Sequence, residues 1–485
     1  MTAKKIFALR ALLLGSVCCL SCAAARANPA SPAPAPTIPA LMISDIHFDP
    51  FHDPAKVSAL AAAPVSGWQA ILAAPDSATQ PQAYAALLKN CGAKAEDTPY
   101  ALLASALQSV RRQATGARFI TLSGDLLAHK FNCRFAQTMP KATPAEYDSF
   151  VEKTMQFEAE KLHAALPRAT LYLALGNNDS NCEDYKLDTG TPFLAAVGKL
   201  AGRMAGPAWN AAAAKDFATG GYYSVTMAAP MQHTRLIVVN DIFLSPGYAH
   251  CSGQADPAPG AAQMQWLQQQ LDAARKLHQR VWVMGHIPPG VNPYSTLSRG
   301  PAAVCGGRKA SMFLASEALG DTLAGNASAI QLAIFAHTHM DELRLLTDPS
   351  APPGTAGVAL KMVPSISPVN GNYPAFMVAR VNPATAELQD YTVIAATDAE
   401  GSAWKPESTF STAYGHTGFT AETLRAVIAG FAGDPAAAQP ASRAYLDAYA
   451  TGAPTRELSP LWPAYVCALT HTHPADYTAC VCEGK

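Results

Sequence analysis

The chain has 485 residues, of which 49% are hydrophobic and 15% are charged. A chain of this length and composition can bury a sizeable core, which excludes a disordered protein and favours one large domain with a smaller extension. The net charge is -1, and Lys and Arg form no run beyond the first ten residues. This excludes the extended basic surface of a nucleic-acid-binding protein, so any affinity for phosphate must come from a local site.

The N-terminal residues follow the pattern of a secretory leader. Basic residues among the first ten precede an apolar stretch at 11–20, and small residues follow up to Ala27. We therefore predict a signal peptide over residues 1–27 and a protein that is exported, either periplasmic or secreted. The apolar stretch is too short to span a membrane, so no transmembrane span is expected in the mature chain. Cys22 leaves a lipoprotein anchor open as an alternative.

Residues 28–39 are a Pro/Ala-rich linker without apolar periodicity, and strand-length apolar runs begin directly after it. The first six runs lie at residues 40–44, 118–123, 170–175, 235–240, 280–284 and 331–336. Helical patterns separate several of them, at residues 99–112, 144–166 and 261–278. This alternation predicts an α/β domain.

Three later runs, at residues 359–363, 376–381 and 387–394, have no helical pattern between them and indicate a second sheet region. We place the main domain at residues 40–398 on this basis. Residues 399–485 differ in character, because an Ala-rich helical pattern covers 420–449 and three cysteines follow it. They are predicted to form a small helical, Cys-containing C-terminal extension.

Removal of the predicted leader leaves eight cysteines, an even number that favours disulfide bonds in an exported protein. No two of them have C-x-x-C spacing, so a thiolate metal site is disfavoured. They are Cys91, Cys133, Cys182, Cys251, Cys305, Cys467, Cys480 and Cys482.

Polar residues of coherent chemistry follow five of the first six predicted strands. Because α/β folds place their sites at the carboxyl ends of strands, we expect these side chains to meet. In chain order they are Asp45, His47, Asp125, Asn177, Asn178, His286, His337 and His339.

The spacing of these residues predicts a metal centre. Asp45 and His47 are two residues apart, so on an extended segment they point to the same side, as His337 and His339 also would. Oxygen and nitrogen donors of this kind suit Zn, Mn or Fe rather than Ca. Seven such ligands exceed one tetrahedral shell and predict two divalent cations that share a bridging carboxylate. We assign the bridge to Asp125, because the preceding Gly124 allows a close approach of backbone and metals.

The ordered motifs D-x-H, G-D, G-N, G-H and H-x-H resemble the calcineurin-like metallophosphoesterase superfamily over about residues 40–395. Four stretches further resemble its acid sphingomyelinase-like phosphodiesterase branch: Gly-Asp-Leu-Leu-Ala-His at 124–129, Gln-Trp-Leu at 265–267, Gly-His-Ile-Pro-Pro-Gly at 285–290 and Pro-Ser-Ile-Ser-Pro at 364–368. The resemblance implies a four-layer αββα sandwich and a metal-dependent phosphoric ester hydrolase. The C-terminal extension also fits this branch, and its family pairing implies a bridge between Cys467 and Cys480.

The resemblance also implies roles for single residues. The first ion would be held by Asp45, His47 and His339 and the second by Asn177, His286 and His337, with Asp125 between them. Zn is the expected metal, with Mn or Fe as alternatives. His129 matches a histidine that the family places near the leaving group, and a surface histidine that caps a loop is the alternative.

Asn178 departs from the family pattern, because the superfamily usually has His at this position. An amide can hydrogen-bond a phosphoryl oxygen but cannot deliver a proton, so proton donation would fall to His129. The Gly-Asn-Asn-Asp sequence also resembles fungal endopolyphosphatases. The substrate therefore stays open among small-molecule or lipid phosphodiesters, phosphoanhydrides such as polyphosphate, and nucleotide phosphomonoesters; a non-enzymatic binding protein is the remaining alternative. His471 and His473 repeat the H-x-H spelling without a preceding strand, which predicts a surface loop.

Overall fold

The computed structural model describes residues 36–348, 354, 356–454 and 458–483. The predicted signal peptide and most of the predicted linker lie outside the described residues. Among the helices that are described, none is long and apolar enough to cross a membrane.

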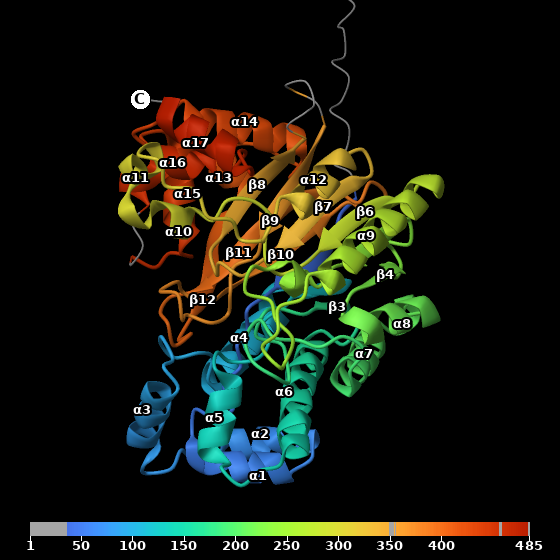
Figure 1. Cartoon of the computed structure of the whole chain (residues 1–485), viewed down its shortest axis with the longest axis vertical. Helices are drawn as coiled ribbons and strands as arrows, with labels where there is room; N and C mark the ends of the chain where they lie inside the picture. The colour runs from blue at the N-terminus through green and yellow to red at the C-terminus, as the bar shows by residue number, and fades with distance from the viewer. Residues whose placement is uncertain (1–35, 349–353, 355, 455–457, 484–485) are drawn as a thin grey trace, which may run out of the picture. The chain divides into compact units, whose positions relative to one another are not determined.

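Two six-stranded mixed sheets form the centre of the structure (Figure 1). The first has the order β12 (Trp404–Thr409), β11 (Leu388–Ala396), β10 (Ala375–Val381), β1 (Ile38–Ile43), β2 (Phe119–Ser123) and β3 (Thr170–Ala174). The second has the order β4 (Tyr223–Thr226), β5 (Thr234–Val238), β6 (Arg280–Met284), β7 (Ile330–Phe335), β9 (Gly357–Met362) and β8 (Glu342–Thr347). Strands β1 to β3 are mutually parallel, as are β5, β6, β7 and β9, so the carboxyl ends of each set lie at one edge.

Successive side chains of β6 point to opposite faces of the second sheet, and their contacts show how the two sheets are layered. The ring of Trp282 contacts Phe119 of the first sheet edge-on, with 5.6 Å between ring centroids, so the sheets pack face to face. Val281 and Val283 point the other way and share a hydrophobic cluster with α9 (Ala258–Lys276) and α12 (Ala318–Gly325). These two helices therefore cover the outer face of the second sheet.

Helices α4 (Tyr100–Gln113), α6 (Pro144–Ala165) and α7 (Pro192–Ala205) belong to the layer beside the first sheet, where α7 contacts β3. Helix α6 begins with a capping box in which Thr143 and Glu146 satisfy each other's backbone N–H groups. The order helix, sheet, sheet, helix confirms the predicted four-layer α/β sandwich. The remaining helices before β8 are α1 (Val57–Ala62), α2 (Val65–Ala73), α3 (Gln80–Asn90), α5 (Phe131–Thr138), α8 (Ala211–Gly220), α10 (Pro293–Thr296) and α11 (Pro301–Cys305).

Residues 399–485, which were predicted to be helical, begin with strand β12. This strand pairs antiparallel with β11 and extends the first sheet. Helices follow it: α13 (Phe410–Tyr414), α14 (Ala421–Ala432), α15 (Pro440–Tyr449), α16 (Trp462–Cys467) and α17 (Pro474–Glu483). The expected bridge between Cys467 and Cys480 is confirmed, and the other disulfides join Cys91 to Cys133, Cys182 to Cys251 and Cys305 to Cys482.

Candidate metal centre

The loops that follow the strands are joined by backbone hydrogen bonds. The N–H of Asp45 donates to the carbonyl of Gly124 at 3.0 Å, and the N–H of His47 donates to the carbonyl of Asp125 at 3.0 Å. Gly124 has a φ of 91°, and a Cβ there would lie 2.6 Å from the backbone nitrogen of Gly176. Only glycine fits this contact, so Gly124 brings the loops after β2 and β3 together.

Five of the predicted ligands have left-handed backbone conformations. The φ angles are 46° for Asp45 and His47, 54° for Asp125, 73° for His337 and 70° for His339. The expectation that each pair lies on an extended segment is therefore wrong, although the side chains do converge. Such conformations cost of order 1–3 kcal/mol each in non-glycine residues and concentrate at functional sites.

The first group of donor atoms surrounds Asp45. Its Oδ1 lies 3.3 Å from Nε2 of His339 and 3.9 Å from Nε2 of His47. The latter nitrogen lies 3.4 Å from Oδ2 of Asp125. Ligand atoms of Asp45, His47 and Asp125 all fall within 4.8 Å of one another.

The second group surrounds Nε2 of His286. This nitrogen lies 3.2 Å from Oδ2 of Asp125, 3.3 Å from Nδ1 of His337 and 3.1 Å from Oδ1 of Asn177. The same carboxylate oxygen of Asp125 therefore faces both groups. All seven residues expected to bind metal are brought together.

Two donor atoms in these groups have no hydrogen-bond partner among the described residues. Asp45 Oδ1 and His47 Nε2 are buried and make no hydrogen bond. Leaving a buried polar atom without a hydrogen bond costs about 1–3 kcal/mol of folding free energy. Two such atoms in one place indicate that a further group binds there. His47 Nδ1 faces the carbonyl of Leu127 at 2.9 Å and His286 Nδ1 faces that of Ser123 at 2.8 Å, which directs both Nε2 lone pairs inward. Inward carboxylate oxygens and imidazole nitrogens fit divalent cations.

Without an ion, the electrostatics of the centre prepare only some of the predicted ligands for metal binding. Burial lowers the pKa of His47 to about 4, with His129 adding to the effect, and burial with His286 lowers that of His337 to about 3. Burial alone would raise the pKa of Asp125, but His286 and His47 hold it well below its ordinary value. His47 and His337 are therefore neutral beside an ionised Asp125. Burial alone would lower the pKa of His286, but Asp125 and Asp45 raise it to about 10, and burial raises the pKa of Asp45 to about 7, so a cation would have to displace a proton from His286.

His129 lies beside the first donor group and is bound to Asp97. Its ring stacks on His47 with 4.1 Å between centroids, and its Nδ1 lies 2.8 Å from Oδ1 of Asp97. The other oxygen of Asp97 accepts hydrogen bonds from the backbone N–H of His129 and from Arg134 Nη2. Burial alone would lower the pKa of His129, but Asp97 raises it above its ordinary value. The side chain is 32% exposed, so Nε2 can be reached from outside.

Asn178 is bound to the shared carboxylate. Its backbone N–H donates to Asp125 Oδ1 at 2.8 Å, and its side-chain Nδ2 donates to Asp125 Oδ2 at 2.9 Å. Both hydrogen bonds orient Asp125 between the two donor groups.

The second H-x-H motif, His471 and His473, lies outside the centre. His473 pairs with Asp321 at 2.7 Å and His471 with the Cys467 carbonyl at 3.1 Å, and neither residue belongs to a donor group found among the described residues.

Curated proteins that match much of the chain in sequence include phosphodiesterases. The chain is 24% identical to the acid sphingomyelinase-like phosphodiesterase 3b of Homo sapiens over 406 residues, covering 79% of this chain and 80% of that protein. It is 24% identical to a cyclic GMP-AMP phosphodiesterase of Rattus norvegicus over 66% of this chain and 67% of that protein. The chain is similar in sequence to the acid sphingomyelinase-like phosphodiesterases. This confirms the resemblance inferred from the motifs.

Other comparisons are weaker than those with the acid sphingomyelinase-like phosphodiesterases. An endopolyphosphatase of Schizosaccharomyces pombe is 27% identical over 36% of this chain and 28% of that protein. Among solved structures, a dimetal phosphatase from Danio rerio matches with a TM-score of 0.40 and 13% identity, covering 74% of this chain and 95% of that one. No family model matches the chain.

Resemblance to the acid sphingomyelinase-like phosphodiesterases did not point to every residue at the centre. Asp179 accepts hydrogen bonds from the backbone N–H groups of Leu126, Leu127 and Gly176, and so joins the loops after β2 and β3. Asp97 comes from a loop with no strand before it, so its position gave no signal. Asp179 was visible in the Gly-Asn-Asn-Asp motif, but its role is only apparent once the loops are placed.

Proposed function

We propose that the chain is an exported dinuclear-metal phosphoesterase that hydrolyses phosphodiester or phosphoanhydride bonds. The observation that carries this proposal is the position of Asp125, whose Oδ2 lies 3.4 Å from His47 Nε2 and 3.2 Å from His286 Nε2. A carboxylate shared by two donor groups is the arrangement that two-metal phosphoryl transfer requires. Buried Asp45 Oδ1 and His47 Nε2, which make no hydrogen bond within the described residues, support it.

The chain's own residues divide into two ligand sets. Asp45, His47 and His339 would hold one ion, Asn177, His286 and His337 would hold the other, and Asp125 would contact both. We propose Zn, with Mn or Fe as alternatives, because the donors are nitrogen and oxygen. When bound, the cations would supply a water nucleophile at neutral pH and neutralise charge on the phosphoryl oxygens.

His129 would act on the leaving group. Hydrolysis forms a bond from the water oxygen to phosphorus and breaks the bond from phosphorus to the leaving oxygen, which then needs a proton. Because Asp97 holds Nδ1 of His129, Nε2 is the nitrogen that would donate this proton. We also propose that Asn178 keeps Asp125 oriented and contacts a phosphoryl oxygen when substrate binds.

We propose the substrate class from the proteins that this chain resembles. A sphingomyelinase-like phosphodiesterase and a cyclic GMP-AMP phosphodiesterase, which match 79% and 66% of this chain, favour a phosphodiester of a small molecule or lipid. The shorter match to an endopolyphosphatase favours a phosphoanhydride as second candidate. A nucleotide phosphomonoester would use the same ligands.

Export is supported by two independent features. The first 27 residues have a leader pattern, and four disulfide bonds join the eight remaining cysteines. Disulfides persist in oxidising compartments, so we propose a periplasmic or secreted enzyme.

Metal depletion followed by reconstitution tests the function. The protein is stripped with a chelator, reloaded with Zn²⁺, Mn²⁺ or Fe²⁺, and assayed on bis-p-nitrophenyl phosphate, p-nitrophenyl phosphate, a nucleoside triphosphate, polyphosphate and sphingomyelin. Activity that disappears on stripping and returns on loading supports the proposal. A protein that holds two ions but hydrolyses none of these compounds would contradict it, and fewer than one ion per chain would favour a binding protein.

A further inference from the structure

The side chain of Asn177 can bind a cation only through its amide oxygen, so the orientation of the amide decides whether this residue is a ligand at all. Its Oδ1 lies 3.1 Å from His286 Nε2, on the side of the donor group. On the opposite side, its Nδ2 donates to Oδ1 of Asp184 at 2.8 Å. A carboxylate only accepts hydrogen bonds, so Asp184 selects the orientation in which the amide oxygen faces His286.

Asp184 lies in a segment without helix or strand, yet it is fixed against Asn177 by the backbone as well. The N–H of the next residue, Tyr185, donates to the carbonyl of Asn177 at 2.9 Å. The hydroxyl of Tyr185 lies 3.5 Å from Nε2 of His337, another member of the same donor group. Two consecutive residues therefore contact two predicted ligands of one ion.

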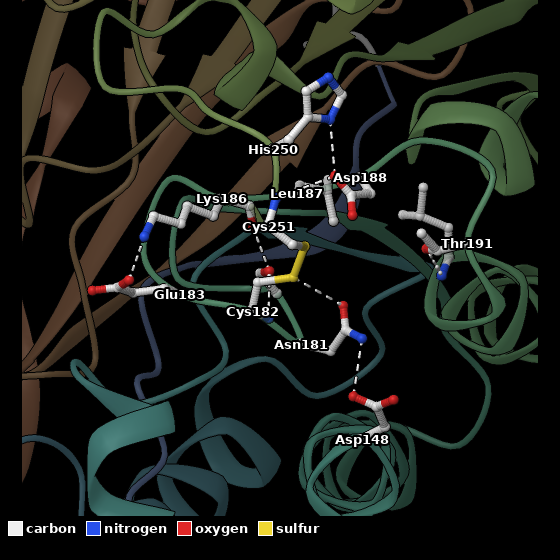
Figure 2. The surroundings of a disulfide bond; sticks show 12 residues. Asp148, Asn181, Cys182, Glu183, Lys186, Leu187, Asp188, Thr191, His250 and Cys251 are labelled. Carbon is white, nitrogen blue, oxygen red and sulfur yellow. Dashed lines mark hydrogen bonds and ion pairs between the residues drawn. A yellow bond between two sulfur atoms is a disulfide. The ribbon is translucent and has the colours of Figure 1, made fainter. Parts of the chain in front are cut away.

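A second loop holds this segment in place (Figure 2). The disulfide between Cys182 and Cys251 joins the segment to the loop before α9. Backbone hydrogen bonds run from Ala249 to Tyr185 and from Leu187 to Ala249, both at 3.1 Å. We call residues 180–188 with 249–251 the disulfide clasp.

An ion pair closes the far end of the disulfide clasp. His250 Nδ1 lies 2.8 Å from Oδ1 of Asp188, which also accepts the backbone N–H of Cys251 at 3.1 Å, as Figure 2 shows. The other ring nitrogen of His250 lies 3.1 Å from Asp256. Asp184 is thus flanked by anchored residues at Cys182 and Asp188, which restricts where its carboxylate can lie.

We propose that Asp184 is a positioning residue for the second metal site, and that the disulfide clasp holds it there. Asp184 belongs to none of the donor groups found among the described residues; it orients the amide of Asn177, whose oxygen would complete the second site with His286 and His337. This inference rests on the metal centre of the proposed function, but it concerns occupancy of one site rather than turnover. Partners that orient metal ligands contribute about 10- to 100-fold to metal affinity.

The test is a metal titration of the full chain without its metals. Cobalt(II) is the probe, because its visible absorption reports each ligand set, and competition with a chromophoric chelator gives the affinities. Wild-type protein is expected to bind two equivalents. Asp184→Ala should weaken one equivalent by about 10- to 100-fold and leave the other unchanged. Asp184→Asn keeps an acceptor oxygen and should restore the second equivalent to within about threefold of wild type.

Glu183→Ala is the matched control, since Glu183 is the adjacent acid and its carboxylate pairs with Lys186 at the surface. It should titrate like wild type. Circular dichroism and melting curves of all variants show whether the fold is intact. Two equivalents at wild-type affinity in Asp184→Ala, or equal losses in Asp184→Ala and Asp184→Asn, would overturn the orienting role.

The contribution of the clasp is tested by replacing both Cys182 and Cys251 with Ser. We expect the same equivalent to weaken by up to about tenfold, while replacing Cys467 and Cys480 with Ser leaves both affinities unchanged. Unchanged cobalt binding after replacement of Cys182 and Cys251 would show that the disulfide clasp does not hold Asp184 in position. If wild type binds two ions and hydrolyses no phosphate ester, the proposed function fails while this inference stands.

Discussion

Asp97 accepts two hydrogen bonds from His129, one from the ring Nδ1 at 2.8 Å and one from the backbone N–H at 3.0 Å. The carboxylate is itself fixed by buried Arg134, whose Nη2 lies 2.9 Å away. Asp97 therefore holds the ring through Nδ1 and stabilises its protonated form, in which Nε2 is the nitrogen that would donate a proton to the leaving oxygen in the proposed reaction.

Replacing His129 should affect substrates according to their leaving groups. We expect His129→Gln to lower the turnover of an alkyl phosphodiester by about 100- to 10,000-fold, because an alkoxide leaves poorly without a proton. Bis-p-nitrophenyl phosphate should lose far less, since nitrophenolate needs no proton. Steady-state assays on both compounds check this, and an equal loss on the two would contradict the acid role.

Removing the charge of Asp97 should shift the pH dependence. The carboxylate raises the pKa of His129, so in Asp97→Asn the ring should lose its proton at lower pH. Activity that requires protonated His129 should then decline at lower pH than in wild type, and the alkaline limb of the kcat profile should move in the acid direction. Melting curves control for the loss of one partner of Arg134. An alkaline limb that does not move would exclude His129 as the titrating acid.

The shared carboxylate should be needed for both ions. Asp125→Ala removes the oxygen that faces His47 and His286, so we expect the ion content to fall below one per chain. Turnover should drop by about 1000-fold or more, equivalent to roughly 4 kcal/mol. Elemental analysis of protein purified in metal-supplemented medium gives the ion content. Two retained ions with normal activity would show that another residue forms the bridge.

Glu407 offers a stability test away from the metal centre. Burial, with Asp341 and Asp447 nearby, raises its pKa to about 7 from an ordinary 4.5. Ionisation of a carboxyl with a raised pKa costs folding free energy; the cost is absent below pH 4.5, grows as the pH rises, and is complete above about 7.

We therefore expect Glu407→Gln to stabilise the protein at pH 8 by roughly 1–2 kcal/mol after solvent screening, and not at pH 4. This corresponds to an increase of about 1–3 °C in the melting temperature. The exposed residue Glu400 provides the control, because Glu400→Gln should change neither curve. A stabilising effect of equal size at both pH values would mean that the charge of Glu407 is not its source.

The sequence was sufficient to predict the apolar strands and the residues that follow them. Apolar runs such as Arg280–Met284, with Val281, Trp282 and Val283 at its centre, lie in the sandwich core, and a short continuous apolar run is typical of a buried parallel strand. Strand β8 was not predicted because Glu342 and Arg344 interrupt its apolar pattern. Both are buried, and their charges are met by groups distant in sequence, such as Tyr294 for Glu342 and the carbonyl of Val291 for Arg344.

The sequence could not supply the groups that support the predicted ligands. Asp97 and Asp184 come from loops, and their partners His129 and Asn177 are identified by tertiary contacts rather than by spacing. The backbone of Asp45 and His47 was also beyond prediction. Alternation along an extended chain explains two side chains on one side, but these residues reach the centre through positive φ angles that only the packed loops impose.

The two sheets each contribute part of the donor set: Asp45, Asp125 and Asn177 follow strands of the first, whereas His286, His337 and His339 follow strands of the second. Neither half forms a dinuclear centre by itself. During synthesis the last ligand emerges close to three hundred positions after the first, so a partly made chain has no place to capture both cations. Binding of two metal ions therefore indicates that both sheets have been synthesised and have packed together.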